Sequence, residues 1–169
     1  MTPAASHWVT DHLDLIPAGG HVLDVACGGG RHLRALLAAG FEVTGIDRDL
    51  SACSDIQNSS CHLLQADLES DEGMPRLPQF HGIVVTNYLH RPILQKLTEY
   101  MRPAGILIYE TFMVGNEQYG RPSNPDFLLQ PGELKQVFIP LLEMMDFREG
   151  EVSLPKQAVT QSIVCRKPD

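Results

Sequence analysis

Three consecutive glycines, Gly28 to Gly30, separate a short apolar run from a segment with helical spacing. Glycine turns between a strand and a helix bind phosphates, dinucleotides or other nucleotide-derived cofactors, because the bare backbone approaches a ligand closely. Asp24 interrupts the apolar run four residues before Gly28, and Asp47 follows a second apolar run. The pattern predicts a cofactor site, and the positions of Asp24 and Asp47 help to identify the cofactor.

The glycine turn matches neither of the two common phosphate-binding patterns. The dinucleotide fingerprint G-x-G-x-x-G requires a third glycine, and this chain has Leu33 at that position. A P-loop requires a lysine followed by serine or threonine, and the glycines are followed by neither. These differences weaken the NAD interpretation, which stays open as an alternative.

Three acids lie in or at the ends of successive predicted strands. Asp24 lies within the first, Asp47 ends the second and Asp67 ends the third. Open α/β sheets bind ligands at the carboxyl ends of their strands, and the position of Asp47 binds ribose hydroxyls. A carboxylate within a buried strand costs several kcal/mol unless donors or a cation meet it. Because Asp24 would repel a pyrophosphate, we expect an adenosyl ligand with a positively charged amino-acid tail.

Hydrophobic spacing predicts alternating strands and helices from residue 21 to about 145. The predicted strands are 21–26, 41–46, 61–65, 81–86, 106–110, 147–154 and 158–166. The predicted helices are 6–16, 31–39, 50–57, 92–101 and, with a kink at Pro140, 131–145. This alternation is typical of a parallel sheet covered by helices on both faces, and the last two strands predict an antiparallel hairpin. The whole chain, 1–169, is predicted to be one domain.

Several segments resemble the class I S-adenosylmethionine-dependent methyltransferases, in matching order and spacing across about residues 20 to 112. The segments are "VLDVACGGGRHLRALLAAG", "VTGIDRD", "ADLE", "GIVVTNYLH" and "RPAGILIYET". The family's first motif most often reads D-x-G-x-G-x-G, and Ala26 replaces its first glycine. Within the family, the pattern resembles small stand-alone enzymes of the tellurite-resistance methyltransferase type. The later segment "ETFMVGNEQYGRPSNPDFLLQPGEL" resembles a further group of small methyltransferases.

The resemblance implies a three-layer, doubly wound α/β fold with a mostly parallel seven-stranded sheet and an antiparallel C-terminal hairpin. It implies S-adenosyl-L-methionine as cofactor and S-adenosyl-L-homocysteine as product. Asp24 would support the amino group, Asp47 both ribose hydroxyls, and Asp67 with Leu68 the adenine. The full set of cofactor-binding residues would be Asp24, Ala26, Gly28, Gly30, Asp47, Arg48, Asp67, Leu68 and Asn87. The catalytic candidates on the acceptor side are Tyr88, His90 and Arg91.

Residues 112–130 follow neither a helical nor a strand period. Their glycines and prolines break both structures, and the segment is too long for a plain connector in a compact domain. We expect a lid over the acceptor pocket, with a dimer contact as the alternative. Its polar candidates are Asn116, Glu117, Tyr119, Arg121 and Asn124.

Composition narrows the partners. The chain has 13 Lys+Arg against 21 Asp+Glu, a formal charge of −8, which argues against a nucleic-acid partner. There is neither an apolar run of the ~20 residues that span a membrane nor a signal peptide at the N-terminus. The four cysteines lack C-x-x-C spacing, which favours reduced thiols, a cytoplasmic location and no metal site. A monomer or a homodimer is expected.

The sequence therefore predicts a methyltransferase acting on a small molecule or small oxyanion, such as tellurite, selenite or a thiol. Methyl transfer depends largely on alignment, so a strong general base is optional. The alternatives are an NAD-linked oxidoreductase and a non-catalytic cofactor-binding module that serves a partner protein. RNA methylation is a lesser possibility.

Overall fold

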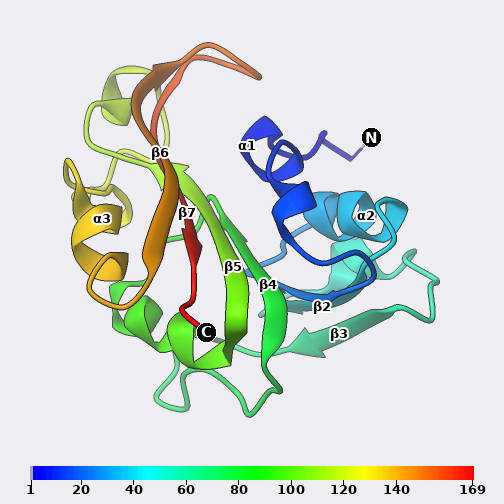
Figure 1. Cartoon of the computed structure of the whole chain (residues 1–169). Coiled ribbons are helices and arrows are strands. Elements are labelled where there is room, and N and C mark those ends of the chain that lie inside the picture. The colour runs from blue at the N-terminus through cyan, green and yellow to red at the C-terminus, as the bar shows by residue number, and fades with distance from the viewer. Residues whose placement is uncertain (1) are drawn as a thin grey trace.

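The computed structural model describes residues 2–169, which form one seven-stranded sheet with the strand order β3-β2-β1-β4-β5-β7-β6 (Figure 1). The first five strands of this order pair in parallel, and β7 is antiparallel to both β5 and β6. This topology confirms the predicted fold class. The strands are β1 (His21–Val25), β2 (Glu42–Asp47), β3 (Cys61–Gln65), β4 (Phe80–Thr86), β5 (Met101–Phe112), β6 (Glu143–Val152) and β7 (Ala158–Arg166).

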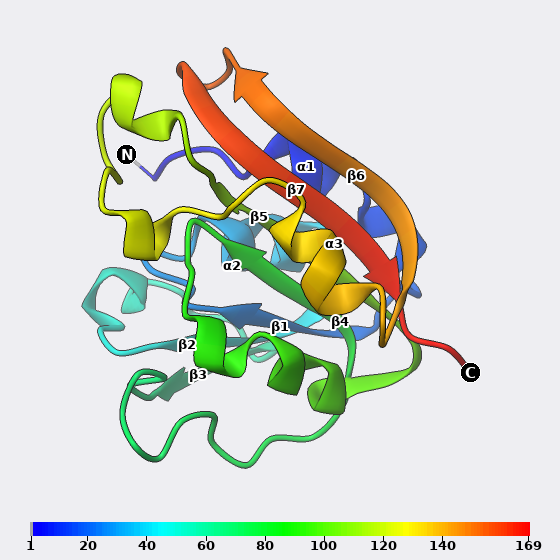
Figure 2. The same ribbon diagram turned by 90° about the vertical axis from the view of Figure 1, so that its left-hand side faces the viewer.

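Helical segments cover both faces of the sheet and make the fold three-layered (Figures 1 and 2). One face carries α1 (His7–Thr10), η1 (Leu13–Leu15), α2 (Arg31–Ala38) and η2 (Ser51–Cys53). The other carries η3 (Arg91–Ile93), η4 (Gln95–Tyr100) and α3 (Glu133–Phe138). The 3-10 helices η5 (Asn116–Gln118) and η6 (Pro125–Phe127) lie within the 112–130 segment. No helix among residues 2–169 is both long enough and apolar enough to cross a membrane.

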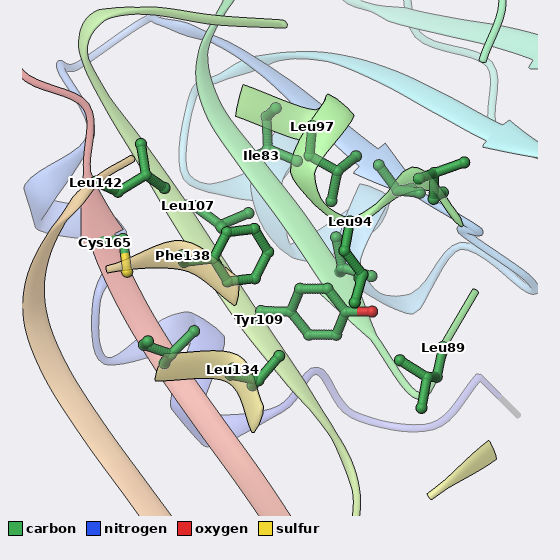
Figure 3. Packing of buried hydrophobic residues seen from close by; sticks show 14 of the residues in the cluster. Ile83, Leu89, Leu94, Leu97, Leu107, Tyr109, Leu134, Phe138, Leu142 and Cys165 are labelled. Atoms are coloured by element: carbon green, nitrogen blue, oxygen red, sulfur yellow. The ribbon is translucent and has the colours of Figure 1, made fainter. Parts of the chain in front are cut away.

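An apolar core lies on each face of the central strands. Strand β4 is buried at almost every position, as expected where helices cover a parallel sheet on both sides. On the α3 face, Tyr109 of β5 packs beside Phe138 and Leu94 (Figure 3). Its hydroxyl donates a hydrogen bond of 2.6 Å to the carbonyl oxygen of Tyr88, just beyond β4. The core thus fixes the backbone where the acceptor-side candidates begin.

Most predicted strands agree with the structure, whereas several predicted helices are wrong in length or type. The helix predicted over 92–101 consists of the 3-10 helices η3 and η4, although its apolar face is buried as expected. The helix predicted over 131–145 ends at Phe138, two residues before Pro140, which cannot donate the next backbone hydrogen bond. Strand β6 then begins at Glu143, which pairs with Arg166 at the end of the antiparallel strand β7, and this tertiary pairing overrides the helical spacing.

Tyr109→Phe should lower the free energy of unfolding by about 1–2 kcal/mol, because the Tyr88 carbonyl then loses a buried donor. Thermal unfolding should show a melting temperature lower by a few degrees. Tyr100→Phe is the matched control, since the Tyr100 hydroxyl donates a longer bond of 3.2 Å from a half-buried position. Equal losses in the two variants would contradict the importance given to the Tyr109 bond.

Candidate active site

The glycine turn after β1 adopts left-handed backbone at alternate residues. Ala26, Gly28 and Gly30 have φ angles of 55°, 54° and 82°. Glycine adopts such angles without strain, whereas alanine there costs about 1–2 kcal/mol. Position 26 therefore constrains backbone conformation as well as the size of the side chain, which the sequence alone did not indicate.

Asp47 joins the end of β2 to the glycine turn. One carboxylate oxygen accepts a 2.8 Å hydrogen bond from the backbone N–H of Gly28, and the other accepts one of 3.0 Å from Asp49. The carboxylate is half-buried and faces a pocket, so two of its lone pairs are used to fix the rim. Its remaining lone pairs can accept hydrogen bonds from a ligand.

Asp24 of β1 is a buried carboxyl group, with only 1% of its surface exposed. Its Oδ2 atom has no hydrogen-bond partner among residues 2–169. Burial is the main cause that raises the pKa of Asp24 to about 8; Arg31 opposes this shift and Asp47 adds to it. A positively charged group bound nearby would stabilise the ionised form.

Two adjoining pockets open at the carboxyl ends of the parallel strands. The larger has a volume of about 420 Å³ and the smaller about 220 Å³. Glu69, Tyr88 and Phe127 line both, so ligands in the two pockets would lie against each other. The larger pocket is also lined by Ala26, Asp47, Arg48, Ala66, Asp67 and Leu68. The smaller is also lined by Asn87, Leu89, Thr111, Phe112 and Pro122.

The remaining cofactor-side candidates divide by their contacts. Arg48 and Asp67 are exposed at the larger pocket, and Leu68 is buried beside it. Asp67 also accepts a 3.0 Å hydrogen bond from the N–H of Glu69, which forms a turn after β3. Asn87 lines the smaller pocket, with a left-handed φ of 52° that asparagine tolerates better than most residues.

The acceptor-side candidates have three different environments. Tyr88 stands at the junction of the pockets. His90 lies behind Glu69, with 3.7 Å between its Nδ1 and a Glu69 carboxylate oxygen. Arg91 donates two hydrogen bonds of 3.1 Å to Glu133 and two more to the carbonyls of Asp126 and Leu128. Its guanidinium therefore ties down the 112–130 segment, which corrects the expectation that Arg91 faces the acceptor.

The 112–130 segment reaches the site through apolar residues rather than through its polar candidates. Asn116 accepts a hydrogen bond from the N–H of Val159, and Tyr119 donates one to Glu151, so both anchor the segment to the C-terminal hairpin. Pro122 and Phe127 line the smaller pocket instead. Sequence reasoning also missed Glu69, although it adjoins Asp67 and Leu68 in the "ADLE" motif. Within residues 2–169, no His, Cys, Asp or Glu cluster is placed to hold a metal ion.

Comparison with known proteins identifies the family. A profile described as a methyltransferase domain matches residues 22–105, which include β1, the glycine turn, β2 and β4. The chain belongs to the class I S-adenosylmethionine-dependent methyltransferases. Its fold is shared by the crystal structure of TehB from Haemophilus influenzae, with a TM-score of 0.80 and 20% identity. That similarity covers 98% of this chain and 63% of TehB.

Two curated relatives of this methyltransferase domain are considerably longer than it is. The tRNA U34 carboxymethyltransferase of Idiomarina loihiensis is 36% identical over 126 residues, which are 65% of this chain and 38% of the relative. The ubiquinone biosynthesis O-methyltransferase of Stutzerimonas stutzeri is 37% identical over 71 residues, 42% of this chain and 28% of the relative. The chain thus aligns with well under half the length of either relative.

The residues of the larger pocket, together with Asp24 and Gly28 of the adjoining strand and turn, fit S-adenosylmethionine. The unpartnered oxygen of Asp24 lies near the turn and matches a cationic amino group. A Cβ atom added to Gly28 would meet no protein atom within 4 Å, so this part of the turn is open to a ligand. Asp47 offers the carboxylate that ribose hydroxyls require.

Asp24→Asn should weaken S-adenosylhomocysteine binding by at least about tenfold, because a charge-assisted hydrogen bond is lost. The same change should alter how stability depends on pH. Because the pKa of Asp24 is raised in the folded protein, ionisation of this carboxyl group opposes folding. The stability that protonated Asp24 contributes is therefore fully present below its ordinary pKa of 3.8 and is lost as the pH rises through about 8. Over this pH range, the free energy of unfolding of Asp24→Asn should increase relative to the wild type by on the order of 2–4 kcal/mol.

Denaturant unfolding at pH 4 to 8, together with calorimetric titration of S-adenosylhomocysteine, measures both effects of Asp24→Asn. Asp71→Asn, which changes an exposed carboxyl group in the loop after β3, is the control and should leave both quantities unchanged. A stability difference independent of pH would show that Asp24 is not buried as described.

Gly28→Ala and Gly19→Ala form a matched pair of glycine substitutions. Both positions have positive φ, 54° and 71°, and neither added Cβ meets a protein atom within 4 Å. Each variant should lose about 1–2 kcal/mol of stability from backbone strain. Only Gly28→Ala should weaken S-adenosylhomocysteine binding, by at least about tenfold, since Gly28 belongs to the turn that is hydrogen-bonded to Asp47 of the larger pocket, whereas Gly19 precedes β1. If the two variants bound S-adenosylhomocysteine with equal affinity, the glycine turn would not be part of the cofactor site.

Proposed function

We propose that this chain transfers the methyl group of S-adenosylmethionine to a small organic acceptor held in the smaller pocket. The observation that carries the proposal is the shared wall of Glu69, Tyr88 and Phe127 between the two pockets. An adenosyl ligand in the larger pocket would place its sulfonium end at this wall. An acceptor on the other side would then lie in line with the methyl group.

Four residues in or beside the larger pocket would bind the cofactor in this proposal. Asp24 pairs with the amino group, Asp47 binds the ribose hydroxyls, and Asp67 with Leu68 contacts the adenine. S-adenosylmethionine, when bound, supplies a methyl group made electrophilic by the sulfonium. The chain contributes alignment and exclusion of water, and orientation alone is worth about 7–11 kcal/mol in favourable cases.

The 112–130 segment forms one wall of the acceptor pocket in this proposal. It contributes Pro122 and Phe127 to the lining, and Arg91 holds its far end against Glu133 at the start of α3. The segment is thus a cover whose position is fixed by hydrogen bonds from a neighbouring element. The lid expected from the sequence stays a prediction, and the segment's residues that line the smaller pocket are Phe112, Pro122 and Phe127 rather than its polar candidates.

An oxyanion acceptor such as tellurite or selenite has less support. None of the residues that line the smaller pocket is a lysine, arginine or histidine, so an anion would bind there without a counter-charge. A tRNA acceptor is the second candidate, because one curated relative is named as a tRNA carboxymethyltransferase. The net charge of −8 remains unfavourable for binding a phosphate backbone.

Calorimetric titration of the full chain should show binding of S-adenosylhomocysteine and none of NADH, because the site lacks the third glycine of the dinucleotide fingerprint. Radiolabelled S-adenosylmethionine should then methylate small aromatic acceptors and leave bulk tRNA unlabelled. Binding of NADH in place of S-adenosylhomocysteine would reject the proposal. Labelling of tRNA alone would establish the second candidate.

A further inference from the structure

The residues that line the smaller pocket include one acidic side chain and no lysine, arginine or histidine. The acidic side chain belongs to Glu69, which follows β3 and faces both pockets. The nearest candidate cation in the sequence, Arg91, makes four hydrogen bonds to Glu133 and to two backbone carbonyls. Arg148 is likewise bound to Glu110, at 3.1 Å. Arg48 lines the larger pocket and not the smaller one, so the charged side chain that an acceptor in the smaller pocket meets is the carboxylate of Glu69.

The remaining walls of the smaller pocket are flat and largely apolar. Phe112, Pro122, Phe127 and Tyr88 line it with rings, and Leu89, which follows β4, adds an aliphatic side chain. Phe127 leaves 48% of its surface exposed despite being aromatic, so it has a free face for stacking. An engineered cavity of about 150 Å³ holds benzene. The pocket volume of about 220 Å³ thus suits one substituted ring or two fused rings.

The surroundings of Tyr88 are also mainly negatively charged at the junction of the two pockets. The pKa of Tyr88 is raised to about 12, mainly by burial and in smaller part by the carboxylates of Glu69, Asp67 and Asp47. Only Arg48 acts in the opposite direction. An anionic acceptor at the junction of the pockets would meet the same three carboxylates.

We infer that the methyl acceptor is a small aromatic ring whose nucleophile is a neutral N–H or O–H group, and that Glu69 accepts the hydrogen bond from that group. This inference rests on the proposed methyl transfer and names its substrate class. The Glu69 side chain is available for the role because it is 41% exposed, and its ion-pair partner within residues 2–169 is His90, at 3.7 Å. His90 then acts as a positioning residue that holds Glu69, and does not itself touch the acceptor.

The reaction balances without a further reagent. A lone pair on the acceptor nitrogen or oxygen forms the new bond to the methyl carbon while the carbon–sulfur bond breaks. The sulfonium becomes the neutral thioether of S-adenosylhomocysteine. The acceptor atom gains positive charge, and its proton passes to the Glu69 carboxylate and from there to water.

Three matched rings test the inference on the full chain loaded with S-adenosylhomocysteine: naphthylamine, naphthol and naphthoate. Their binding is measured by ligand-observed NMR. The amine and the phenol should bind at least about tenfold more tightly than the carboxylate, because only they donate a hydrogen bond to Glu69. In Glu69→Gln this preference should fall to within about twofold. With S-adenosylmethionine, formation of the N-methyl or the O-methyl product distinguishes the two kinds of nucleophile.

The control variant is Glu72→Gln, which removes an exposed carboxylate three residues further along the chain and should keep the wild-type preference. Melting temperatures of both variants report whether they fold. The inference is overturned if naphthoate binds as tightly as the amine, if no ring binds, if Glu69→Gln keeps the preference, or if tellurite is methylated. Failure of S-adenosylhomocysteine to bind in the first step would instead reject the proposed function, so the two failures are distinguishable.

Discussion

Parallel pairing of β1 with β2 on one side and β4 on the other is the constraint on which the site depends. In this register Asp24 lies opposite Gly45 of β2 and Val84 of β4. All three strands must therefore leave the sheet at the same edge, and the chain turns away in opposite directions from β1 and β4. A crevice forms at such a reversal of strand order. Polar residues at these strand ends therefore become neighbours in space although they lie far apart in the sequence.

Several residues at the rim of this crevice have an unfavourable backbone conformation or environment. Burial of apolar side chains in the two cores offsets this free-energy cost. Ala26 and Asn87 hold left-handed backbone at the ends of β1 and β4, and Asp24 buries a carboxyl oxygen without a partner. Strained backbone of this kind persists only where the surrounding structure determines it. The hydrogen bond from Tyr109 to the Tyr88 carbonyl shows how the core does so, since it fixes the chain directly after Asn87. Geometry suited to a ligand is thus maintained by residues that never touch one.

The sequence predicted the strands and the cofactor side of the site better than the helices and the acceptor side. Strands β3 and β7 have the predicted bounds because polar residues flank both, and prolines flank β7 as well. The start of β6 was missed because Met145 continues a helical spacing and only pairing with β7 makes it a strand. Asp47 and Gly28 belong to a motif of fixed spacing, and their hydrogen bond spans 19 positions. The contact of Arg91 with Glu133 spans 42 positions and follows no motif, so only the folded chain reveals it.

The bidentate contact between Arg91 and Glu133 also helps to fix the 112–130 segment independently of the strand ends. The sequences of these two parts can therefore change independently. The strand ends and the turns after them supply most of the lining of both pockets, whereas the 112–130 segment contributes Phe112, Pro122 and Phe127. Because the segment is fastened at its ends to α3 and the C-terminal hairpin, its middle tolerates new side chains without loosening the strands. Selection on a short surface loop could therefore redirect such a protein to a new compound while its donor chemistry stays the same.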